Sequence, residues 1–110
     1  MAYDEELGER IRVQLASERG VTEKRMFGGL AFLINGNMAV SASGQGGLLL
    51  RVDPARSDAL LREPDVERAV MRGRPMDGWL RVAVDAETTE PELARWIGHG
   101  VGYARSLPPK

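Results

Sequence analysis

The chain contains no cysteine. This absence excludes disulfide bonds, thiolate nucleophiles and zinc sites built on thiolates, and it favours an intracellular location. His99 is the single histidine, and its immediate sequence neighbours are glycines. Acid–base or metal chemistry would need a nucleophile or carboxylates beside it. We therefore interpret His99 as a structural or surface residue.

Long apolar runs and an excess of either charge are also missing. No run approaches the roughly 18 apolar residues that a membrane span needs, and the acidic start of the chain lacks the features of a signal peptide. The formal net charge is −1, so the protein as a whole has no electrostatic attraction for nucleic acid or an anionic membrane. We expect a cytoplasmic protein with no membrane partner.

Motifs for catalysis or cofactor binding are missing too. The glycine-rich segment 98–102 lacks the preceding strand and the helix start of a phosphate-binding loop, and segment 44–47 joins two expected strands. Acidic residues are scattered, without the spaced cluster of a calcium or magnesium site. Ser41, Ser43 and Ser57 have no nucleophile-elbow context. The sequence predicts a protein that is not an enzyme and that has no cofactor or metal site.

What is present is the composition of one globular domain spanning residues 1–110, with 43% hydrophobic and 28% charged residues. Apolar residues recur every four positions from Tyr3 to Leu15, which predicts an amphipathic helix over 3–19 with Gly20 just beyond its end.

Residues 24–37 hold the paired glycines Gly28 and Gly29 within an apolar run that ends at Asn35-Gly36. The Asn-Gly pair predicts a type I′ hairpin turn, because both of its central residues need positive φ. We expect one continuous strand before this turn. Both of its faces are apolar, so the second face is covered by another element or another copy of the chain, or its small residues tolerate partial exposure.

The remaining patterns predict further strands and two capped helices. We expect strands over 38–42 and 48–52, a helix that begins at Asp53-Pro54 and stops before Pro64, and a strand over 79–85. Residues 65–70 fit either a helical turn or an irregular crossover, and 71–78 could hold a short strand.

The last helix is expected to run from a Thr89–Glu92 capping box to about Ser106. Its interior glycines Gly98, Gly100 and Gly102 disfavour a helix, so either the helix ends early or close packing compensates, and we favour close packing. The order α-β-β-β-α-β(-β)-α groups strands and helices, which predicts an α+β fold with a mostly antiparallel two-layer sheet.

The remaining group of similar side chains in the sequence is basic. If Arg72 and Arg74 lie beside the end of the first strand, they could form an anion or phosphate-backbone patch with Arg25 and Arg81. The alternative is that these arginines pair with nearby acids on a solvated surface. Trp79 begins a strand next to this segment, and it is either a partner-binding anchor or a core residue.

Several motifs in their order resemble the N-terminal domain of the TfoX (Sxy) family. They are Arg25-Met-Phe-Gly-Gly29, Leu50-Arg-Val-Asp53, Met71-Arg-Gly-Arg-Pro-Met76, Gly78-Trp-Leu-Arg-Val82, and a final helix with Trp96 and Tyr103-Ala-Arg-Ser-Leu-Pro108. The resemblance is collinear and covers nearly the whole chain. It implies a secretion-chaperone-like fold of an antiparallel sheet with packed helices, often as a homodimer.

The family's regulators of natural competence assist a cyclic-AMP receptor protein at promoters, and they carry an additional C-terminal helical domain that this chain does not show. We therefore expect a stand-alone domain that acts as a protein-interaction module, as a homodimer, with regulation of transcription through a protein partner as its implied role. The alternatives are nucleic-acid binding through the arginines and small-molecule binding near Gly28 and Gly29. The expected interaction surface comprises Arg25, Phe27, Gly28, Gly29, Arg72, Arg74 and Trp79.

Overall fold

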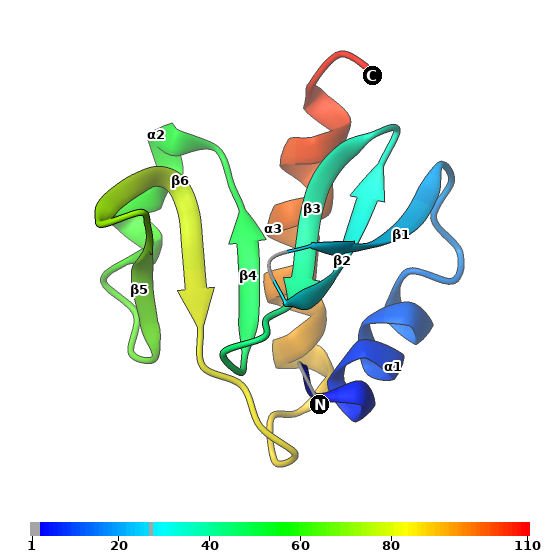
Figure 1. Cartoon of the computed structure of the whole chain (residues 1–110), viewed down its shortest axis with the longest axis horizontal. Helices are drawn as coiled ribbons and strands as arrows, with labels where there is room; N and C mark the ends of the chain where they lie inside the picture. Colours follow the sequence, from blue (N-terminus) through cyan, green and yellow to red (C-terminus); the bar gives the residue numbers. More distant parts are fainter. Residues whose placement is uncertain (1–2, 27) are drawn as a thin grey trace.

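The computed structural model describes residues 3–26 and 28–110. Within them lie three helices and a six-stranded antiparallel sheet with the strand order β1-β2-β3-β4-β6-β5 (Figure 1). The predicted α+β class is confirmed. None of the helices in these ranges is long and apolar enough to cross a membrane. The elements are α1 (Glu5–Gln14), β1 (Val21–Met26), β2 (Gly29–Ile34), β3 (Asn37–Ala42), β4 (Leu48–Arg51), α2 (Pro54–Leu60), β5 (Val66–Met71), β6 (Arg74–Val82) and α3 (Glu90–Ser106).

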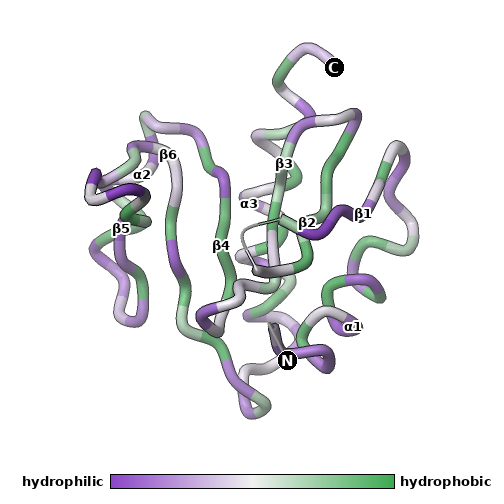
Figure 2. The backbone as a smooth tube through the Cα atoms, viewed as in Figure 1, coloured by the Kyte–Doolittle hydropathy of each residue, from purple (hydrophilic) through white to green (hydrophobic). Residues whose placement is uncertain are grey.

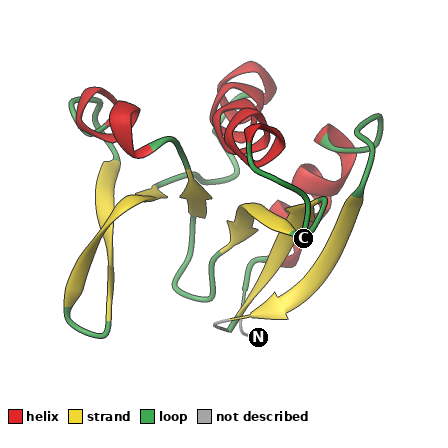
Figure 3. Cartoon of the chain, turned by 90° about the horizontal axis from the view of Figure 1, so that it is seen from above, coloured by secondary structure: helices red, strands yellow, loops and turns green. Residues whose placement is uncertain are grey.

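All three helices lie on the same face of the sheet (Figure 3). The main core forms between them and one side of the strands, where Phe32, Val40 and Leu50 are completely buried. Alternate residues of each strand point to this face, as the two-residue period of a strand requires. The helical side of the core is supplied by Leu7, Ile11, Leu15, Leu60, Leu93, Trp96, Ile97 and Ala104.

The expected single strand before Asn35 is in fact the two strands β1 and β2. Met26 pairs with Gly29 in an antiparallel register, and Gly28 has a φ of 74°. The prediction of one strand was wrong because a glycine that can adopt positive φ lets the chain reverse inside an otherwise extended stretch. β1 is polar and lies at the edge of the sheet, whereas β2 is apolar and lies between β1 and β3, a contrast in hydropathy visible in Figure 2.

The predicted Asn35-Gly36 turn is confirmed. Ile34 pairs with Asn37 across a two-residue loop in which Asn35 and Gly36 have φ values of 53° and 85°. This turn also holds the last residues of the chain, because the Lys110 amide donates a hydrogen bond of 2.8 Å to the Asn35 carbonyl. The hairpin therefore fixes the segment that follows α3.

The first helix is shorter than predicted. Asp4 caps it by accepting hydrogen bonds from the amides of Glu6 and Leu7, and the helix ends at Gln14. Gly20, with a φ of 73°, lies in the turn into β1, where its carbonyl accepts a hydrogen bond of 2.9 Å from the Asn35 amide. Gly20 is therefore not the residue that ends the helix.

Residues 66–82 form a second hairpin, β5–β6. Arg72 and Gly73 occupy its two-residue turn with φ values of 53° and 76°. Neither alternative for residues 65–70, a helical turn or an irregular crossover, is correct. An edge strand with a register shift between Arg68 and Val70 leaves no regular alternation to read from the sequence.

The caps of α2 and α3 follow their sequence signals. Asp53 accepts a hydrogen bond of 2.9 Å from the Ala55 amide at the start of α2, and Thr89 accepts one of 3.3 Å from the Glu92 amide at the start of α3. The Glu92 carboxylate instead accepts a bond of 3.0 Å from the Trp96 indole. Only the threonine half of the predicted capping box is thus observed.

The three glycines of α3 serve different purposes. A Cβ atom on Gly100 would lie 2.4 Å from the carbonyl oxygen of Ala39 in β3, whereas a Cβ on Gly98 or Gly102 would meet nothing within 4 Å. The helix continues through all three, so it does not end early. The prediction of close packing is confirmed for Gly100 alone.

These glycines give opposite predictions for the same substitution. Gly100→Ala should lower the free energy of unfolding by about 2 kcal/mol or more, because α3 must move away from β3. Gly98→Ala, the matched control two residues away on the same helix, should raise it by about 0.5–1 kcal/mol through helix propensity. Urea unfolding followed by circular dichroism measures both, and similar values for the two variants would contradict the packing argument.

Candidate functional site

The face of the sheet opposite the helices carries a second apolar cluster made only of strand residues. We call this side of the sheet the open face, and the cluster on it the apolar strip. The buried members of the strip are Ala31, Met38, Leu49 and Ala69, and the half-buried members packed against them are Met26, Leu33 and Trp79.

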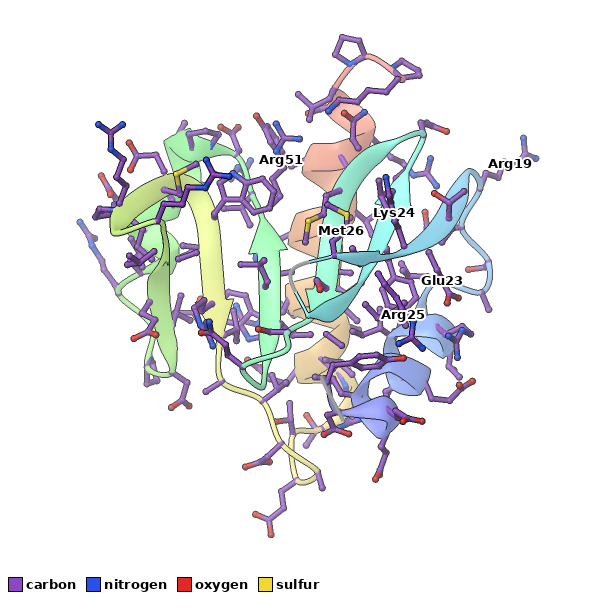
Figure 4. All side chains as sticks on the ribbon, in the orientation of Figure 1. Arg19, Glu23, Lys24, Arg25, Met26 and Arg51 are labelled. Atoms are coloured by element: carbon purple, nitrogen blue, oxygen red, sulfur yellow. The ribbon has the colours of Figure 1, made fainter. Side chains whose placement is uncertain are left out.

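The apolar strip is unusual for a sheet face that no helix covers. An antiparallel sheet with one wet face normally presents polar side chains on it. Here the strip runs from Met26 at the end of β1 (Figure 4) to Trp79 in β6. None of the described elements packs over it, so its half-buried side chains are available for contact with another surface.

Basic side chains share the open face with the apolar strip. The strand register places Lys24 opposite Ala31, Arg81 opposite Leu49 and Arg51 opposite Trp79. Arg81 donates a hydrogen bond to the Gln45 side chain and lies 3.9 Å from a Glu67 carboxylate oxygen. The open face therefore combines apolar contact area with positive charge and one acidic partner.

Arg51 lies between aromatic rings from both sides of the sheet. Its guanidinium carbon is 5.5 Å from the centroid of the Trp79 ring and 5.6 Å from that of Tyr103 in α3. Both distances allow a cation–π interaction. Figure 4 places Arg51 at the end of β4, beside α3. This side chain orients Trp79 on the open face.

The glycine pair was expected inside one strand and Trp79 at the start of another, but Gly28 lies in the turn between β1 and β2, Gly29 begins β2, and Trp79 lies within β6. Trp79 is half-buried in the strip, which combines the two alternatives considered for it. Gly28 supplies the turn conformation, and a Cβ on Gly29 would lie 2.3 Å from the Ala42 carbonyl oxygen of the neighbouring strand. Close approach at Gly29 is therefore made by the chain itself. Phe27 lies outside the described residues.

The predicted arginine patch does not form. Arg25 lies in β1, at one edge of the sheet, with its guanidinium 5.8 Å from the centroid of the Tyr3 ring on the helical side. Arg72 and Arg74 lie in the β5–β6 hairpin at the opposite edge, so Arg72 and Arg74 are not beside the end of the first strand. The sheet order could not be known from the sequence, and it places three strands, β2, β3 and β4, between β1 and the β5–β6 hairpin.

A groove between α2 and α3 was missed by the sequence interpretation. Its volume is about 370 Å³, and its lining includes Val52, Arg56, His99 and Tyr103. The bare backbone of Gly98 and Gly102 forms part of its wall. The four-residue spacing of these glycines was the available signal, because it places both on one side of a helix. We call this hollow the α2–α3 groove.

His99 is the titratable group of the α2–α3 groove. Burial lowers its pKa below the ordinary value, and the positive charges of Arg95 and Arg56 lower it further, while Glu63 opposes them. The His99 ring also lies 5.9 Å, centroid to centroid, from the Trp96 ring. A neutral imidazole at pH 7 follows. Among the described residues, no group of three or more His, Cys, Asp or Glu side chains is arranged to hold a metal ion.

Comparison with known proteins identifies a family. The model of the TfoX N-terminal domain matches residues 13–104, which is most of the 110-residue chain. Searches among curated proteins and among solved structures find no match.

The single histidine allows a direct test of the electrostatics in the α2–α3 groove. In a proton NMR titration, the His99 pKa should fall below its ordinary value of 6.5, and Arg56→Gln should raise it toward that value by removing a positive charge. Arg62→Gln, an exposed arginine outside the groove lining, is the control and should leave it unchanged.

The lowered pKa of His99 also makes the stability of the fold depend on pH. The unfolded chain binds a proton at His99 more readily than the folded chain, so the free energy of unfolding should decline as the pH falls below about 6.5. His99→Gln should lessen this decline in thermal melts measured across that range. A His99 pKa at or above 6.5 would contradict the described environment.

Proposed function

The chain belongs to the TfoX N-terminal domain family, and on this basis we propose that it is a non-enzymatic protein-interaction module whose contact surface is the open face. The observation that carries the proposal is the apolar strip on a sheet face without helices. Half-buried Met26, Leu33 and Trp79 would gain stabilisation by leaving water at an interface. Aromatic and methionine side chains are enriched at such surfaces.

A second copy of the chain is the first partner that we propose. A net charge of −1 per copy produces little repulsion between copies. In a two-fold symmetric dimer the same surface meets itself, so the open face must be self-complementary. Its strip offers apolar area to both copies, and Lys24 or Arg81 of one copy could lie against Glu67 of the other.

The β1 edge of the sheet is less suitable for this association. β1 presents exposed Glu23, Lys24 and Arg25, and charged side chains on an edge strand discourage strand addition. This supports a dimer that forms through the open face. We extend the proposal to transcriptional co-regulation through a further protein partner, which is the role that the family resemblance implies.

The alternative functions have less support. Nucleic-acid binding required Arg25, Arg72 and Arg74 to converge, and they lie at opposite edges of the sheet. A ligand site at Gly29 has no space, because the Ala42 carbonyl occupies the position of a side chain there. A gel shift at low salt that is lost in Arg72→Ala would favour nucleic-acid binding over the protein-interaction proposal.

Light scattering coupled to size exclusion tests the dimer. We expect the wild-type chain to elute as a dimer at micromolar concentration, and Leu33→Asp to shift it toward monomer by placing a charge in the interface. Val13→Asp is the matched control, since Val13 is 66% exposed on α1 and should not affect association.

A second variant, thermal melts and tryptophan emission distinguish loss of folding from loss of association. Met26→Glu makes the same test at the other end of the strip, and thermal melts show whether each variant is folded. Trp79 emission should shift to the blue as the wild-type concentration rises, while Trp96, only 3% exposed, contributes a constant background. A wild-type monomer at high micromolar concentration would overturn the dimer.

A further inference from the structure

The α2–α3 groove is built around missing side chains. Gly98 and Gly102 are exposed in the interior of α3, and a Cβ atom on either would have no atom of the described residues within 4 Å. Glycine costs about 1 kcal/mol relative to alanine at each such position, and neither is needed for packing in the way that Gly100 is. At about 370 Å³, the groove lies within the size range of small-molecule sites.

The polar groups in the groove leave a positive charge without a partner. Asp53 also lines the groove; its Oδ1 accepts the Ala55 amide as the cap of α2, and no ion pair between Asp53 and Arg56 is found among the described residues. Arg95, one turn before His99, is paired with Glu63 at 2.7 Å and with Glu92 at 2.6 Å. Arg56 takes part in none of the ion pairs found among the described residues.

The apolar part of the groove lining combines an aromatic residue with bare helix backbone. Val52 is buried beneath it, the Tyr103 ring forms part of one wall, and the backbone of Gly98 and Gly102 adds no protruding side chain. Such a surface accommodates a planar apolar body. A guanidinium matches a carboxylate in geometry and charge, and a protonated imidazole adds a further donor.

We propose that the α2–α3 groove binds a small carboxylic acid with a flat apolar body, whose carboxylate is held by Arg56 and His99. The body lies against Val52, Tyr103 and the exposed backbone of α3. This site is separate from the open face, because the groove lies on the helical side of the sheet. Its test therefore does not depend on whether the chain dimerises.

A bound carboxylate also reverses the electrostatics at His99. In the free protein, burial and the positive charges of Arg95 and Arg56 lower the His99 pKa, and the negative charge of Glu63 raises it. Asp53 is a further charged residue in the groove lining. An additional negative charge beside the ring favours the imidazolium. Affinity for the acid should therefore rise as the pH falls through the His99 titration.

Sodium benzoate is the probe, and NMR of the uniformly labelled chain is the measurement. We expect saturable shifts of the His99 ring protons and of the Gly98 and Gly102 amides, together with a His99 pKa that is higher in the complex. Acetate, which lacks the flat body, should bind more weakly. Arg56→Gln should weaken benzoate binding roughly tenfold, as expected for a charge-assisted hydrogen bond, and Arg62→Gln should not.

Gly102→Leu gives a second, steric test. Leucine favours the helix and would extend into the groove, so this variant should remain folded while benzoate binding is lost. Shifts that do not saturate, or that survive in both Arg56→Gln and Gly102→Leu, would overturn the proposal. If inorganic phosphate binds as tightly as benzoate or more tightly, the assignment of the ligand as a flat carboxylic acid is overturned.

Discussion

The contact of Gly100 with the Ala39 carbonyl determines how the two layers of the domain meet. A Cβ atom on Gly100 would lie only 2.4 Å from that oxygen, and because glycine has no Cβ, α3 can lie directly on β3. From this position the helix buries Leu93, Trp96 and Ile97 in the core. An ion pair of 2.8 Å between Arg10 and Glu90 then joins α1 to α3, and one of 2.7 Å between Arg105 and Glu18 joins α3 to the segment that follows α1.

This arrangement leaves the domain with two very different sides. The helices cover one face of the sheet, yet the apolar character of β2, β3 and β4 extends to both faces. Small or tightly packed residues such as Ala31 and Leu49 limit the exposure of the second face, and only Met26, Leu33 and Trp79 at its margin remain half-buried. The open face is thus compatible with a folded single chain and also suited to a partner.

Local sequence signals predicted local structure well. Asn35-Gly36 identified a turn, Asp53-Pro54 a helix start and Thr89 a cap, because each of these depends on residues close in sequence. The β5 strand was missed, since its exposed edge position and register shift remove the alternation that marks a strand. β1 and β2 were merged because Gly28 permits but does not require a turn.

The candidate sites depended on information that no local pattern contains. Trp79 was identified as a possible contact residue, but the strip around it appears only when β2, β3, β4, β5 and β6 are placed side by side. The arginine hypothesis failed for the same reason, because Arg25 and Arg72 looked close only while the strand order was unknown. His99 was interpreted as a structural or surface residue, and the groove that it lines depends on the position of α2 against α3, which no local pattern shows.

The strand order also bears on how the chain reaches this structure. Every neighbouring pair in the sheet except β4 and β6 is consecutive in sequence, and the turns at Asn35-Gly36 and Arg72-Gly73 are only two residues long. Closing such short loops costs little chain entropy, whereas joining β6 to β4 requires a long closure around α2 and β5. We expect the hairpins to form early in folding, and the slow step to be the one that brings β6 and α3 onto the first half of the sheet.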